Sequence, residues 1–171
     1  MTINESWGYN PEDTRLKSAR QLIHSLCEVA GKGGNLLLNV SPMADGRLPP
    51  EQVERLAAVE SWMARHRESI LGTEPGLEPW QFYGPSTRRG ERVYLHLLMR
   101  PYETLTVRGV PVRRVRSAAA LATGTALTTS TRCTVADTLF NSDPNGELTI
   151  GVPGSMLDEH ATVIAIDLAS E

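Results

Sequence analysis

Hydrophobic residues in the first third of the chain recur at the spacing of helix faces. One apolar stripe consists of Leu16, Ala19, Ile23, Leu26, Cys27 and Ala30. Asn10 is a capping residue and Pro11 suits the first helical turn, so we expect the helix to begin here or at Thr14. Glycines that end helices follow the stripe, at Gly31, Gly33 and Gly34.

A second helical pattern begins at Pro49 and Pro50. Its stripe, with one polar interruption, is Val53, Leu56, Ala57, Glu60 and Met63. Between the two helical patterns runs the apolar segment from Leu36 to Val40, which is typical of a buried parallel strand. The order helix, strand, helix is part of a βα repeat.

The pattern changes after Gly72, where glycines and prolines mark a linker over residues 72–79. Short alternating or β-branched segments then follow one another, separated by turn residues. We predict strands over residues 92–98, 104–107, 112–118, 126–131, 134–140, 147–152 and 162–168. Strands of this length and spacing are typical of a small antiparallel sandwich.

Length and composition agree with two small units. The chain has 171 residues, 40% of them hydrophobic, which is enough to bury a core. We therefore predict an α/β part over residues 1–73 and an all-β domain over residues 76–171.

Four segments of the first part carry a family resemblance. Residues 33–42 read Gly-Gly-Asn-Leu-Leu-Leu-Asn-Val-Ser-Pro, and residues 2–10 include Ser-Trp-Gly-Tyr. Together with residues 48–52 and 70–73, they resemble the α-L-fucosidases, glycoside hydrolase family 29. The departure within the strand segment is Ser41, where that family usually has Gly.

The resemblance implies that residues 1–73 are the last βα units of a (β/α)8 barrel and that residues 76–171 are the C-terminal β-sandwich. A complete barrel takes about 250 residues, so this part cannot close alone. A truncated or remnant enzyme, a split enzyme with a separately encoded N-terminal barrel portion, and a misplaced start all remain open. The rival interpretation is a non-catalytic carbohydrate-binding or structural module.

The resemblance also implies hydrolysis of α-L-fucosidic bonds with retention, by an Asp nucleophile and a Glu acid/base. The resemblance places the Asp on an earlier barrel strand and the Glu also upstream of Met1, so we assign no catalytic residue and expect the chain alone to be inactive. Glu5 and Asp45 could be nominated as substitutes, but we interpret the first as a polar loop residue and the second, with Gly46, as a turn.

Trp7 is the strongest candidate for contact with sugar. An indole offers a flat apolar face to a pyranose ring, and the family places this segment at the substrate end of the barrel. The alternative is a core aromatic at the barrel end. Asn39, and more weakly Asn35, could hydrogen-bond a ligand or satisfy neighbouring loop backbone.

The remaining aromatic, histidine and cysteine residues favour structural roles. His24 and His66 have no second ligand at i+4, so we predict no metal site, and the family needs no cofactor. Two cysteines, Cys27 and Cys133, are expected to be reduced and buried. We expect Trp62, on the second helix, to pack against the neighbouring element. Three further aromatics are expected to anchor the first strand of the sandwich to the barrel end, with a sugar-binding surface as the alternative: Trp80, Phe82 and Tyr83.

The resemblance implies a fucosylated glycan or fucoside as the binding partner, and the charge of the chain indicates no other. The net charge of -3 offers no footprint for nucleic acid, and no apolar run approaches the ~20 residues of a membrane span. We therefore predict neither partner. The start of the chain lacks a charged leader with an apolar segment, and the sequence assigns no compartment.

Overall fold

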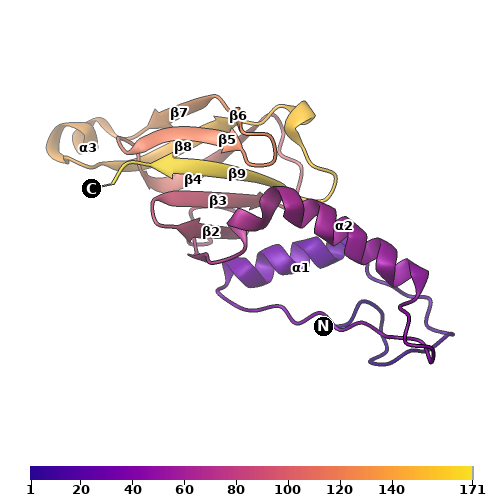
Figure 1. The fold of residues 1–171 in the computed structure, drawn as a ribbon. Helices are drawn as coiled ribbons and strands as arrows, with labels where there is room; N and C mark the ends of the chain where they lie inside the picture. The colour runs from indigo at the N-terminus through magenta and orange to yellow at the C-terminus, as the bar shows by residue number, and fades with distance from the viewer. Residues whose placement is uncertain (171) are drawn as a thin grey trace.

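The computed structural model describes residues 1–170, which form three layers (Figure 1). Two helices, α1 (Ala19–Gly31) and α2 (Pro50–His66), pack on one face of a six-stranded sheet. A three-stranded sheet packs on the other face. Apolar surface is thus buried both between helices and sheet and between the two sheets.

The six-stranded sheet is antiparallel, in the order β1-β2-β3-β9-β5-β6. Its strands are β1 (Glu74–Pro75), β2 (Ser86–Arg89), β3 (Arg92–Leu97), β5 (Val115–Ala120), β6 (Thr125–Ala126) and β9 (Thr162–Leu168). Strand β3 is buried on both faces: Val93 and Leu95 belong to the core between the sheets, whereas Tyr94 packs with the helices.

The three-stranded sheet is also antiparallel, in the order β4-β8-β7. Its strands are β4 (Thr104–Pro111), β8 (Asn145–Gly151) and β7 (Thr129–Arg132). Alternate residues such as Leu105 on β4 and Leu148 on β8 enter the core. The antiparallel sheets predicted from the sequence are confirmed.

The first helix begins later than predicted. Ser18 is its N-cap, and Ser18 and Gln21 form a reciprocal capping box. Residues 10–17 are not helical because Asp13 instead holds a loop together: its carboxylate accepts hydrogen bonds from the backbone of Glu5, Ser6 and Arg15. The predicted start at Pro11 or Thr14 is therefore wrong, while the end at Gly31 is confirmed.

The segment from Leu36 to Val40 is extended but is not a buried strand, contrary to the prediction. Its one ladder contact among the described residues is an isolated parallel bridge between Thr2 and Asn39. The Leu37 side chain is 72% exposed. A strand needs a hydrogen-bonded neighbour along its length, and among the described residues only Leu37 and Asn39 of this segment have one, in residues 1–3.

Helix α2 starts at Pro50 as predicted, but it buries a different face. Its buried residues are Gln52, Trp62 and His66, while Val53 from the predicted stripe is 48% exposed. Trp62 donates a hydrogen bond from Nε1 to the carbonyl of Ala161, 2.8 Å away, and this contact fixes the helix on the sheet.

The β-rich half contains further corrections. Residues 134–140 were predicted as a strand but form the helix α3 (Val135–Phe140), capped by the Thr134 side chain, which accepts from the backbone N–H of Asp137. Residues 126–131 are split between β6 and β7, the predicted linker contains β1, and strand β2 was not predicted. A single-turn 3-10 helix, η1 (Arg67–Ser69), follows α2, and another, η2 (Gly154–Met156), precedes β9.

The aromatic residues predicted to anchor the sandwich to the barrel end pack on the sandwich itself, and the half-exposed Tyr83 ring lies beside that of Phe82. Phe82 is buried between the two sheets, and Trp80 lies against Gly109 of β4.

Both cysteines are free; burial raises the pKa of the Cys27 thiol to about 12, whereas Cys133 is only half-buried. Among the described residues, no helix has the length and apolar character to cross a bilayer.

Candidate functional site

A closed loop presents Trp7 at the surface of the helical part. The backbone N–H groups of Glu5 and Ser6 donate to Asp13 Oδ2 at 3.1 and 2.8 Å. Hydrogen bonds, first from the Ser6 side chain and then from the loop backbone, hold the pKa of Asp13 below its usual value. The ionised carboxylate therefore fixes the loop, and the Trp7 side chain is 74% exposed.

The structure brings the two predicted site residues together. Asn39 lies beside the start of the chain, with its backbone N–H donating to Met1 O (2.8 Å) and its carbonyl accepting from Ile3 N (3.2 Å). Its side-chain Nδ2 donates to the backbone carbonyl of Trp7 at 2.8 Å. Asn39 thus positions the Trp7 loop, whereas Asn35 is exposed beside Leu36 and takes no part in this contact.

A buried polar network lies under the loop, and the sequence analysis missed it. Ser41 N donates to Gln52 Oε1 at 3.0 Å, and Ser41 Oγ donates to Asn4 Oδ1 at 3.2 Å. All three side chains are buried. The one sequence signal was Ser41 itself, because a hydroxyl in place of the family's Gly needs a partner when buried.

A hollow of about 320 Å³ lies next to this network. Its lining combines polar groups of Asn4, Asn10 and Asp13 with the half-exposed ring of Tyr9 and with Met43. Polar groups beside apolar surface are typical of small-molecule sites. Trp7 stands outside this hollow, so the loop offers one free indole face and a separate polar recess.

The two carboxylates that could substitute for the catalytic pair, Glu5 and Asp45, form ion pairs with arginines. Glu5 pairs with Arg15, and Asp45 pairs with Arg47, whose Nε lies 2.7 Å from Oδ2. The hydrogen bonds from Arg47 lower the pKa of Asp45. A general acid needs the opposite shift, so Asp45 is unsuited to protonate a leaving group.

The histidines do not gather at this site. His24 Nε2 lies 2.9 Å from the carbonyl of His160, and His66 is buried on α2. No group of three or more possible His, Cys, Asp or Glu metal ligands occurs within residues 1–170.

Sequence comparison places this arrangement among known proteins. Residues 1–68 match the family described as α-L-fucosidase. The α-L-fucosidase of Dictyostelium discoideum is 38% identical over 76 residues, which are 43% of this chain and 16% of that protein. The tissue α-L-fucosidase of Homo sapiens is 34% identical over 102 residues, or 56% of this chain and 22% of that protein.

Similarity in structure extends over nearly the whole chain. An α-L-fucosidase isoenzyme from Paenibacillus thiaminolyticus aligns with a TM-score of 0.84 and 31% identity, covering 99% of this chain and 39% of that one. A family 29 enzyme from Bacteroides thetaiotaomicron, trapped as a covalent intermediate, aligns with a TM-score of 0.82 and 26% identity, covering 99% and 37%. The chain thus spans well under half the length of these relatives.

Proposed function

We propose the domain assignment of this chain from its membership of the α-L-fucosidases of glycoside hydrolase family 29, whose C-terminal part it matches. Residues 1–73 are the last βα units of a catalytic barrel, and residues 76–171 are the accessory sandwich. In this proposal the chain forms one wall of the pocket of a retaining enzyme that cleaves α-L-fucosidic bonds of a fucosylated glycan or fucoside. The observation that carries it is the hydrogen bond that joins Asn39 to the exposed Trp7 loop.

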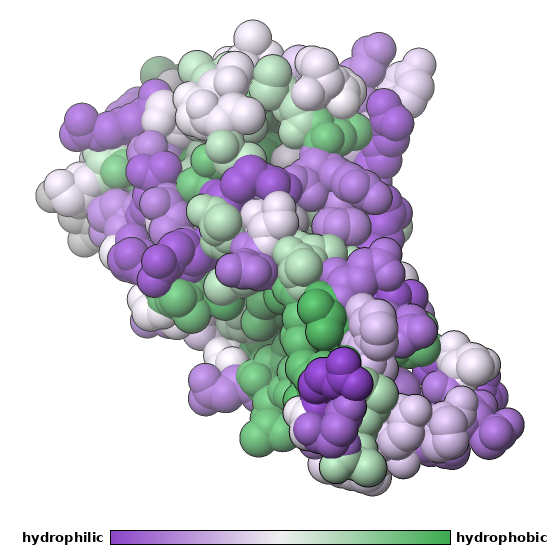
Figure 2. Space-filling view, turned by 45° about the vertical axis from the view of Figure 1, so that its right-hand side comes forward, coloured by the Kyte–Doolittle hydropathy of each residue, from purple (hydrophilic) through white to green (hydrophobic). Residues whose placement is uncertain are grey.

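The course of the chain supports the barrel assignment. The segment at Thr2 and the segment at Asn39 run parallel, and α1 connects them, which is the order of a βα repeat. Among the described residues, the backbone groups of Leu36, Leu38 and Val40 have no strand partner, and the Leu37 side chain is exposed. Hydrophobic side chains gather at the surface of this helical part (Figure 2). An N-terminal barrel portion, in the same chain or separate, would pair this edge and cover these side chains.

Catalysis is proposed to depend on that barrel portion. Retaining glycosidases place two carboxyl groups about 5 to 5.5 Å apart. Glu5 and Asp45 are instead paired with arginines. No other carboxylate of the described residues takes part in the hydrogen bond between Asn39 and Trp7. We therefore infer that residues 1–171 alone do not hydrolyse an α-L-fucoside.

Reconstitution tests this function. Purified chain should show no turnover of an aryl α-L-fucoside, and coexpression with the N-terminal barrel portion of a full-length relative, ending before Thr2, should restore it. In the reconstituted enzyme, Trp7→Ala should lower kcat/KM by about tenfold or more, because the stacking face is lost. Tyr102→Ala is the matched control, since this side chain is 89% exposed on the loop before β4.

Two results would contradict the proposal. Turnover by the isolated chain that disappears in Glu5→Ala or Asp45→Ala would place the catalytic carboxylates within these residues. Equal kcat/KM for Trp7→Ala and Tyr102→Ala, at equal amounts of folded protein, would remove Trp7 from the pocket.

A further inference from the structure

The outer face of the three-stranded sheet carries a row of polar side chains. On β4, Leu105 and Val107 point into the core, so Thr106 and Arg108 point outward. Thr106 lies opposite Thr149 of β8, which in turn lies opposite Ser130 of β7. The helices pack on the other sheet, so within the described residues neither α1 nor α2 covers this face (Figure 1).

One rung of this face joins three charged residues across the three strands. Arg108, Glu147 and Arg132 are register partners on β4, β8 and β7. Glu147 Oε1 lies 3.7 Å from Arg108 Nε, and its Oε2 lies 2.7 Å from Arg132 Nη2. Neighbouring strands are ~4.8 Å apart, so the rung is ~10 Å wide. Because one carboxylate lies between the two guanidinium groups, the rung offers hydrogen-bond donors and acceptors and keeps a net charge of +1.

A shallow hollow of about 330 Å³ adjoins this rung. Besides Arg132 and Glu147, its lining includes Thr134 and Asn145. Hydroxyl, amide, carboxylate and guanidinium groups therefore converge on one small area at the α3 end of the sheet.

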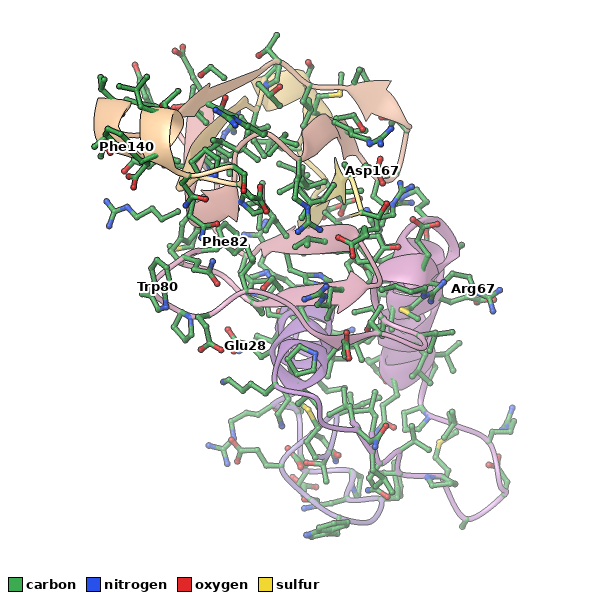
Figure 3. All side chains as sticks on the ribbon, turned by 90° about the vertical axis from the view of Figure 1, so that its left-hand side faces the viewer. Glu28, Arg67, Trp80, Phe82, Phe140 and Asp167 are labelled. Atoms are coloured by element: carbon green, nitrogen blue, oxygen red, sulfur yellow. The ribbon has the colours of Figure 1, made fainter. Side chains whose placement is uncertain are left out.

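The exposed indole of Trp80 lies at the opposite end of the rung, beside β4. The neighbouring Gln81 holds this loop on β4: the Gln81 carbonyl accepts from Arg108 N at 2.9 Å, and Gln81 Nε2 donates to Gly109 O at 3.1 Å. Trp80 lies so close to Gly109 that a Cβ there would come within 2.4 Å of its ring. The ring is nevertheless 64% exposed, on the side of the molecule that also carries Phe140 and away from Arg67 (Figure 3).

We propose that this surface, formed by Trp80, Arg108, Glu147 and Arg132, binds a neutral oligosaccharide. The indole stacks on the apolar C–H side of one sugar ring, and the charged rung exchanges hydrogen bonds with the hydroxyl groups of the next rings. A neutral ligand fits because Glu147 compensates one of the two arginines, and the single positive charge that remains is a weak attraction for a polyanion. The expectation of a fucosylated ligand rests on the proposed function, whereas the site itself is separate from the Trp7 loop.

Binding of fucosyllactose, a neutral trisaccharide, to the full chain tests this inference. Titration followed by amide NMR should shift the signals of β4, β7 and β8 near the rung. Trp80→Ala should raise the Kd for fucosyllactose by about three- to tenfold, and Arg132→Ala should also raise it. Tyr102→Ala, an exposed aromatic before the other end of β4, should leave the Kd unchanged. Near-UV circular dichroism of each variant checks that the fold is retained.

Three results would overturn the inference: shifts confined to the Trp7 loop, an unchanged Kd in Trp80→Ala, or no response to fucosyllactose. Salt-sensitive binding of heparin in place of fucosyllactose would indicate a polyanion surface. The measurement needs no hydrolysis, so failure of the reconstituted fucosidase would leave its outcome unaffected.

Discussion

Two buried histidines lie where α2 meets the sheet. His66 Nδ1 is 2.9 Å from the carbonyl of Trp62 and must donate to it. Thr87 Oγ1 donates to Ser69 O at 2.6 Å, which leaves it to accept from His96 Nε2 at 3.1 Å. Burial, with a smaller contribution from His66, lowers the pKa of His96 to about 3, and burial also lowers the pKa of His66.

These histidines should make stability depend on pH. The unfolded chain binds a proton at His96 near its ordinary pKa of 6.5, whereas the folded chain binds it only near pH 3, so protons favour unfolding between these values. The free energy of unfolding should fall by about 1.4 kcal/mol per pH unit for this group from about pH 6 to about pH 4. Urea unfolding of the wild type and His96→Gln measures it, and equal slopes in the two proteins would refute the assignment.

At the scale of the elements, α1 depends on its capping box. Gln21 N donates to Ser18 Oγ at 3.2 Å, and Ser18 N donates to Gln21 Oε1 at 2.8 Å. These bonds satisfy backbone donors that a helix start would otherwise leave free. The cap also fixes where the Asp13 loop ends and the helix begins.

Removal of the cap should destabilise the chain. Ser18→Ala is expected to lower the free energy of unfolding by about 1 kcal/mol, and Ser18→Asp should restore most of it. Ser142→Ala, an exposed serine in the turn before β8, is the control. Chemical denaturation that gave the same stability for both alanine variants would show that the box contributes nothing measurable.

At the scale of the whole molecule, one tryptophan joins the helices to the sandwich. Trp62 packs with Ile23 and Cys27 of α1 and with Tyr94 and Val163 of the sheet. The core between the two sheets is separate from this cluster. We therefore propose that residues 76–171 can fold alone, and that the helical part depends on docking.

Trp62→Ala should test this dependence. Loss of the buried indole is expected to cost about 3–5 kcal/mol, and the helices should become protease-sensitive while the sandwich stays folded. Trp80→Ala, the same change at an exposed position, should alter stability by less than about 0.5 kcal/mol. Proteolysis that removed the sandwich first would contradict the proposed domains.

The sequence alone determined those features that local chemistry fixes. Pro50 starts α2, Gly31 ends α1, and the alternation in β4 and β8 defined strands, because each signal acts within a few residues. It also nominated Trp7 and Asn39, which the structure joins by a hydrogen bond across 32 residues.

Tertiary structure decided what depends on distant partners. The Asp13 loop delayed α1, the sheet selected the face of α2 that carries Trp62, and the Asn4, Ser41 and Gln52 network formed from three separate segments. Residues 36–40 have the composition of a strand, yet among the described residues they pair only with residues 1–3, and the Leu37 side chain stays exposed. Composition supplies the tendency to pair, but a ladder forms only where a second backbone supplies the hydrogen bonds.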